Sequence, residues 1–144
     1  MDRSSTGDRQ PAPRLSIDDM LARARASLQR LEPDEALEAQ RDGALLIDTR
    51  SDEARSIDGS IPGALHLPLS TLEWRVDPDS PWRDARVGGL ESRLVLVCAQ
   101  GYSSSLAAAR LQQLGFDRAT DVIGGFEAWA SRGLPVAQGE QEGT

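Results

Sequence analysis

The stretch "LVLVCAQGYSSSLAAARLQQLG", residues 94–115, decides the fold of this 144-residue chain. Apolar residues run without interruption into Cys98, the only cysteine. Such a run is typical of a short strand buried on both faces. The alanine- and leucine-rich segment 106–114 then predicts a helix that stops at Gly115. A strand that leads through a short loop into a helix is the repeating unit of a parallel α/β sheet.

Helical and extended segments alternate along the rest of the chain. An amphipathic pattern with Ser16 as its N-cap predicts a helix over 17–31. Further helices are predicted over 33–41 and 126–133, and extended segments over 44–48, 64–67 and 120–125. Residues 73–92 are predicted to form a long loop that Trp74 and Trp82 anchor. This alternation predicts a parallel sheet with helices on both faces.

The composition excludes several classes of function. A formal net charge of −7 argues against a nucleic-acid partner and against an anionic membrane surface. All 16 basic residues are arginine, so mechanisms that need a lysine are excluded. One cysteine and one histidine cannot build an internal disulfide or a structural zinc site, and we expect no metal. The chain shows neither a signal-peptide pattern nor a membrane-length apolar run, so a cytoplasmic location is expected.

Both ends of the chain are polar and lack apolar periodicity. Residues 1–15 and 137–144 are therefore predicted to be disordered tails. The folded part is expected to be one domain over residues 16–136, which is long enough for a single hydrophobic core.

Cys98 lies where a reactive thiol is expected. In parallel sheets, ligands bind at the carboxyl ends of the strands, and Cys98 stands at such an end, shortly before a helix. A short loop of small residues can turn several N–H groups toward one point, where they stabilise a thiolate or a bound anion. The residues of this candidate loop are Ala99, Gln100, Gly101, Tyr102, Ser103 and Ser104. The alternative is that Cys98 is only a small buried hydrophobic residue.

Three motifs in the chain resemble those of the rhodanese (sulfurtransferase) family, in the same order. Residues 45–69, "LLIDTRSDEARSIDGSIPGALHLPL", resemble the first signature region, with Asp-x-Arg after a strand and an Ile-Pro-Gly-Ala turn. Residues 97–105, "VCAQGYSSS", are similar to the active-site loop that begins at the catalytic cysteine. Residues 123–136, "IGGFEAWASRGLPV", resemble the closing motif. The resemblance covers about residues 33–136.

The resemblance implies a three-layer α/β sandwich with about five parallel strands, together with the extra N-terminal helix. It also implies that Cys98 carries sulfur as a persulfide, loaded by a donor such as thiosulfate and unloaded by cyanide or a thiol. The N–H groups of the loop after Cys98 would stabilise the outer sulfur. The expected partners are small sulfur-containing anions and a thiol or protein acceptor, and no cofactor is implied.

One departure from the family pattern concerns charge. The loop position that often holds arginine is Ser103 here, and Arg75 is a candidate to supply the missing charge to a substrate anion. The alternative is that Arg75 is a solvated loop residue. Asp48 and Arg50, just after a predicted strand, are interpreted as a partly buried ion pair that supports the neighbouring loops rather than as catalytic groups.

Rival functions remain at this point. A cysteine-dependent phosphatase of the same fold needs Cys-x5-Arg, but the sixth residue after Cys98 is Ser104, so phosphatase activity is not expected. A non-enzymatic rhodanese-like binding or regulatory module is a second alternative, although such modules usually lack the cysteine. A third is a persulfide carrier that delivers sulfur to a partner protein. The sequence does not separate the carrier from a free-standing transferase.

Overall fold

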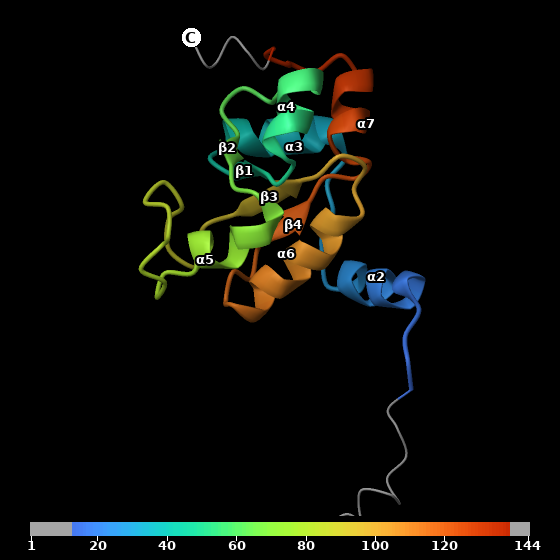
Figure 1. Cartoon of the computed structure of the whole chain (residues 1–144), viewed down its shortest axis with the longest axis vertical. Helices are drawn as coiled ribbons and strands as arrows, with labels where there is room; N and C mark the ends of the chain where they lie inside the picture. Colours follow the sequence, from blue (N-terminus) through green and yellow to red (C-terminus); the bar gives the residue numbers. More distant parts are fainter. Residues whose placement is uncertain (1–12, 139–144) are drawn as a thin grey trace, which may run out of the picture.

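The computed structural model describes residues 13–138. Its centre is a parallel sheet whose strands lie in the order β2-β1-β3-β4 (Figure 1). The strands are β1 (Leu45–Asp48), β2 (Leu65–His66), β3 (Leu94–Val97) and β4 (Thr120–Asp121). The apolar runs therefore form the two central strands, β1 and β3, as their continuous hydrophobicity predicts.

Helices cover both faces of the sheet, so the predicted three-layer architecture is confirmed. In Figure 1, α3, α4 and α7 lie above the sheet, and α2, α5 and α6 lie below it. The helices are α2 (Ile17–Ala26), α3 (Pro33–Arg41), α4 (Asp52–Asp58), α5 (Leu72–Val76), α6 (Ser103–Gln113) and α7 (Gly125–Ser131), and a 3₁₀ turn covers Leu69–Thr71. Because side chains alternate along β3, Leu94 and Leu96 pack into one core and Val95 and Val97 into the other.

The described residues hold four strands rather than about five, and the helix predicted over 17–31 ends at Ala26. Both differences have one cause. Leu31 forms a single parallel bridge with Val122 at the edge of β4. The Leu31 amide donates to the Asp121 carbonyl at 3.1 Å, which requires extended backbone before Pro33. The fifth strand position is thus reduced to one bridge.

The segment 73–92 is not only a loop, since α5 covers Leu72–Val76. The prediction that the tryptophans anchor it is wrong, because Trp74 and Trp82 are 57% and 69% exposed. The apolar residues Leu72, Val76 and Val87 are buried and hold this segment on the core.

The predicted tails lie largely outside the described residues, namely 1–12 and 139–144. At the C-terminal end, Ala137 forms an antiparallel bridge with Ser60, so the attached part of the chain reaches one residue beyond the predicted boundary. Within residues 13–138, no helix has the length and hydropathy needed to cross a membrane.

Candidate active site

Cys98 follows β3 directly, at the carboxyl edge of the sheet, and is 6% exposed. The loop after it curls back over the sulfur, so that the Gly101 amide donates to Sγ at 3.1 Å. The Ser104 hydroxyl oxygen lies 3.2 Å from the same sulfur. The thiol is therefore held from two sides by polar groups of its own loop.

Gly124 and Gly125 form a turn that packs against this loop, the paired-glycine turn. The amide of Phe126, in the first turn of α7, donates to the Cys98 carbonyl at 2.8 Å. Gly101 adopts φ +87°, and a Cβ on it would lie 2.7 Å from the amide nitrogen of Gly124. A Cβ on Gly125 would meet the Cys98 carbonyl oxygen. The loop and the turn approach each other closely only because these positions carry no side chain.

The thiol of Cys98 is more acidic than an ordinary cysteine. Burial raises the pKa of the thiol, because it disfavours the charged form. Hydrogen bonds that the thiolate accepts from Ser104, Ser103 and Gly101 lower the pKa by more than burial raises it. Since the thiolate is the nucleophile, this environment favours a reactive cysteine over an inert buried one.

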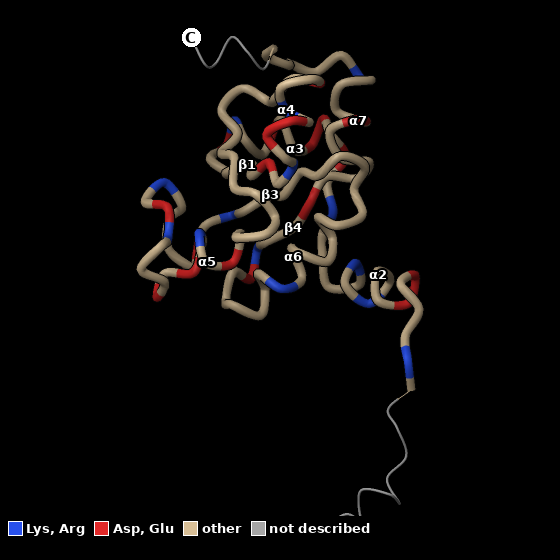
Figure 2. The backbone as a smooth tube through the Cα atoms, in the orientation of Figure 1, with Lys and Arg blue, Asp and Glu red and all other residues tan. Residues whose placement is uncertain are grey.

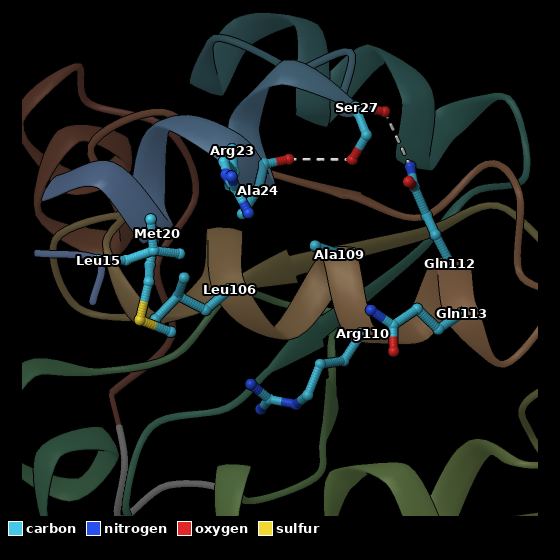
Figure 3. A pocket seen from close by; sticks show the side chains of 10 residues that line it. All are labelled: Leu15, Met20, Arg23, Ala24, Ser27, Leu106, Ala109, Arg110, Gln112 and Gln113. Atoms are coloured by element: carbon cyan, nitrogen blue, oxygen red, sulfur yellow. Dashed lines mark hydrogen bonds between the residues drawn. The ribbon is translucent and has the colours of Figure 1, made fainter. Parts of the chain in front are cut away.

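A buried carboxylate lies behind the loop. Asp121 in β4 is fully buried, and Figure 2 shows this acidic strand inside the fold. The hydroxyls of Ser104 and Ser105 both donate to its Oδ2 at 2.7 Å. Arg30 donates through Nε to Oδ1 at 2.8 Å and through a terminal nitrogen to Oδ2 at 3.2 Å. The carboxylate is thus an ion-pair partner and also an acceptor for the cysteine loop.

Two arginines of the N-terminal segment donate hydrogen bonds to the same loop. Arg25 and Arg30 donate to the Gly101 carbonyl at 2.8 and 3.1 Å. Arg25 also donates through Nε to the Ser105 hydroxyl at 3.0 Å, and its guanidinium lies 5.7 Å from the centre of the Tyr102 ring. The N-terminal segment is therefore part of the frame of the site and not only an addition to the fold.

The sequence prediction missed Arg25, Arg30 and Asp121. A signal for Asp121 was available: a charged residue in a buried strand needs a partner. Nothing in the sequence says which arginine supplies it, because the partner lies 91 residues away.

The six predicted loop residues follow the thiol without a break, but their side chains make different contacts. They are Ala99, Gln100, Gly101, Tyr102, Ser103 and Ser104. Gly101 and Ser104 contact the sulfur directly. Gln100 points instead to Glu127, to which it donates at 3.0 Å, and Tyr102 is 60% exposed. An anion-binding role of the whole loop stays a prediction.

Asp48 and Arg50 form the buried ion pair that their position suggested. The guanidinium of Arg50 donates to Asp48 Oδ1 and Oδ2 at 3.0 and 2.8 Å, and the side chains are 3% and 1% exposed. Arg50 also donates to the Gly59 carbonyl at 2.8 Å and lies 3.8 Å from the centre of the Phe126 ring. These contacts connect the ends of β1 and α4 to the turn beneath Cys98.

Arg75 forms an ion pair with Asp84 of its own segment. Its guanidinium donates to Asp84 at 3.1 Å, and Arg86 pairs with the same carboxylate at 2.7 Å. Hydrogen bonds from Arg86, opposed by burial and helped by the charge of Arg75, place the pKa of Asp84 well below its usual range. A role for Arg75 toward a substrate anion stays a prediction. Within residues 13–138, no group of three or more His, Cys, Asp and Glu side chains is arranged to hold a metal ion.

Comparison with known proteins shows the family of this chain. The model of the rhodanese-like domain matches residues 32–132, which is most of the chain. The chain belongs to the rhodanese-like family. It is 35% identical over 119 residues to the thiosulfate sulfurtransferase GlpE of Pseudomonas putida, covering 81% of this chain and 99% of that protein. With the GlpE of Pseudomonas entomophila it shares 34% identity over 106 residues, covering 74% of this chain and 88% of that one.

Solved structures agree on the fold. A protein of unknown function from Rhodopseudomonas palustris, described as a possible tyrosine phosphatase, superposes with a TM-score of 0.78 at 29% identity, covering 89% of this chain and 98% of that one. The polysulfide-sulfur transferase homodimer of Wolinella succinogenes gives a TM-score of 0.62 at 25% identity, covering 81% of this chain and 82% of that one. The chain is accordingly a rhodanese-like sulfurtransferase with a parallel α/β fold.

Proposed function

We propose that this rhodanese-like enzyme transfers a sulfane sulfur through a persulfide on Cys98. The observation that carries the proposal is the buried thiol at the end of β3, with the Gly101 amide 3.1 Å and the Ser104 hydroxyl 3.2 Å from its sulfur. The lowered pKa of Cys98 supplies the thiolate that such chemistry needs. Thiosulfate is the donor that the names of the relatives suggest.

The reaction balances without a metal or an external redox partner. The Cys98 thiolate attacks the outer sulfur of thiosulfate, a new S–S bond forms on Sγ, and the S–S bond of thiosulfate breaks. Sulfite leaves with the bonding electron pair. In the second half, cyanide or a thiolate attacks the outer sulfur of the persulfide, and the Cys98 thiolate returns as the leaving group. The N–H groups and the hydroxyl at the sulfur stabilise the negative charge in both half-reactions.

A single cysteine has a consequence for the acceptor. Since Cys98 is the only thiol of the chain, no second cysteine can resolve the persulfide as an internal disulfide. The sulfur therefore leaves to a separate molecule, either a small thiophile or a thiol on a partner protein. A carrier that serves one protein acceptor and a transferase with a small acceptor share the first half-reaction and differ only in the second.

Phosphatase chemistry is not favoured, although one structural relative is described as a possible tyrosine phosphatase. A phosphate-binding cysteine loop needs an arginine at the sixth position after the cysteine. That position is Ser104, whose hydroxyl lies against the Cys98 sulfur and donates to Asp121.

Intact mass spectrometry tests the proposal. The protein is incubated with thiosulfate, measured, and measured again after cyanide, with Cys98→Ser as the matched control. We expect the wild type to gain one sulfur, to lose it to cyanide, and to release thiocyanate, whereas the variant gains nothing. If the wild type takes up no sulfur from thiosulfate or polysulfide while iodoacetamide still alkylates Cys98, the proposal is refuted and a binding module becomes the better description.

A further inference from the structure

The hydrogen-bond chain behind Cys98 has a direction. A serine hydroxyl has one proton, and that of Ser104 is directed at Asp121, 2.7 Å away. The neutral Cys98 thiol therefore donates to the Ser104 oxygen, over 3.2 Å. When Cys98 ionises, the hydroxyl has to turn from the carboxylate to the sulfur to stabilise the thiolate. The thiolate of Cys98 and the carboxylate of Asp121 therefore compete for the same hydrogen-bond donor, the Ser104 hydroxyl.

Arg30 makes that exchange favourable. After Ser104 turns away, Asp121 still accepts hydrogen bonds from Ser105 and from two nitrogens of Arg30. The Arg30 side chain is 15% exposed and that of Asp121 is fully buried, so water screens their charges weakly. Without Arg30, a buried negative charge would lie one hydroxyl group away from the thiolate and would oppose its formation.

We propose that Arg30 and Asp121 are positioning residues that set the acidity of Cys98 through Ser104. Arg30 stabilises the thiolate because its positive charge compensates that of Asp121. Asp121 opposes formation of the thiolate because it accepts the hydrogen bond of the Ser104 hydroxyl. Arg25 assists by fixing the Gly101 carbonyl, so that the Gly101 amide stays directed at the sulfur. The proposal rests on the proposed function, because it assigns these residues to the thiol that carries the sulfur.

Other charged groups surround the cysteine loop, and they stay constant in the test below. Glu127 of α7 accepts from Gln100 on the outer side of the loop. The Asp48–Arg50 pair lies beneath, across the Phe126 ring. Because these charges remain when Arg30 or Asp121 is replaced, a change in the acidity of the thiol reports on the replaced pair.

The test is the rate of Cys98 alkylation by iodoacetamide as a function of pH, which gives the pKa of the thiol without any sulfur transfer. Arg30→Ala is expected to raise this pKa by about one unit, and Asp121→Asn to lower it by a similar amount. Arg30→Lys is expected to restore most of the wild-type value, because it keeps the charge. Arg30→Ala combined with Asp121→Asn is expected to return the pKa close to the wild-type value.

The opposite signs separate this role from a structural one. If the ion pair only kept the loop in place, both single variants would loosen the loop and move the pKa in the same direction. Shifts of the same sign, or a double variant that adds to the effect of Arg30→Ala, overturn the proposal. If Arg30→Ala destabilises the fold, the combined variant and Arg30→Lys still decide the test. Neither of them leaves the buried Asp121 carboxylate without a counter-charge. Arg23→Ala, on an exposed position of α2, is the matched control and is expected to leave the pKa unchanged.

The outcome is distinguishable from that of the proposed function. Sulfur uptake by mass spectrometry on the same variants reports on the persulfide, whereas alkylation reports only on the thiol. If opposite pKa shifts are found but no sulfur is taken up, the positioning role holds and the persulfide proposal fails. If sulfur is taken up but the pKa does not respond to Arg30→Ala or Asp121→Asn, the positioning role fails alone.

Discussion

Replacing Gly101 by alanine tests whether the cysteine loop really touches the paired-glycine turn. Gly101 has φ +87°, a left-handed conformation, and its missing Cβ would lie 2.7 Å from the Gly124 nitrogen and 3.2 Å from its Cα. Real Cβ atoms do not approach backbone so closely, so the loop, the turn or both must move. The movement would also withdraw the Gly101 amide from the Cys98 sulfur, which it meets at 3.1 Å.

The magnitude has two parts. An L-residue in the left-handed region costs about 1–2 kcal/mol. Forcing an extra methyl group into a closely packed site adds about 1–3 kcal/mol. Gly101→Ala is therefore expected to lower the free energy of unfolding by about 2–5 kcal/mol. Gly133 provides a matched control, because it has φ +74° and nothing within 4 Å of its Cβ position, so that Gly133→Ala shows the conformational part alone.

Urea unfolding and iodoacetamide alkylation measure the two consequences. Gly101→Ala is expected to lower the unfolding midpoint well below that of Gly133→Ala and to slow alkylation of Cys98 at neutral pH. Gly133→Ala is expected to leave the alkylation rate unchanged. Equal unfolding midpoints for the two variants, with equal alkylation rates, would show that the close approach of the loop to Gly124 is not a feature of the protein in solution.

Three further outcomes follow from the buried polar groups. Arg50→Ala leaves the carboxylate of Asp48 buried without its main partner and is expected to cost about 3–5 kcal/mol in urea unfolding. Asp84 has a lowered pKa in the folded protein, so its contribution to stability is present above the unfolded pKa of about 4 and is lost as the pH falls. The stability difference between wild type and Asp84→Asn is therefore expected to be largest near pH 7 and to shrink below pH 4. Ser104→Ala removes a hydroxyl from the sulfur, so the pKa of Cys98 rises and alkylation at pH 7 slows by up to about tenfold.

The Arg50→Ala variant has a control on the surface. Arg41→Ala breaks an exposed contact of 3.9 Å with Glu38 and is expected to change stability by less than about 0.5 kcal/mol. A destabilisation by Arg50→Ala as small as that by Arg41→Ala, or a constant gap for Asp84→Asn at all pH values, would contradict the reasoning.

The sequence was sufficient to predict the sheet and the cysteine loop because both are encoded locally. The continuous apolar run before Cys98 marks a strand buried on both faces, and the small residues after it mark the turn into a helix. The helix starts at Ser103 instead of 106, because the serines that suggested a loop occupy its first turn, where they meet Asp121.

What the sequence did not reveal depends on long-range contacts. The helical pattern over 17–31 is real as far as Ala26, but the last residues are recruited by the edge of β4, and no local signal shows that edge. The prediction that the tryptophans anchor segment 73–92 was wrong because the size of an aromatic side chain does not decide its burial. The smaller side chains of Val76 and Val87 are buried there instead. The partnership of Arg30 with Asp121 joins residues 91 positions apart, which only the folded topology brings together.

The segment that the family model matches is shorter than the segment on whose contacts the fold and the site depend. The shared region runs from residue 32 to 132, whereas Arg25 and Arg30 precede it, and the Trp129 indole donates to the carbonyl of Pro135 beyond its end. A protein trimmed to the shared region, or a chimera that exchanges it, would bury Asp121 without its counter-charge and leave Trp129 without its acceptor. A comparison restricted to residues 32–132 therefore leaves out Arg25 and Arg30, the two arginines that contact the loop after Cys98.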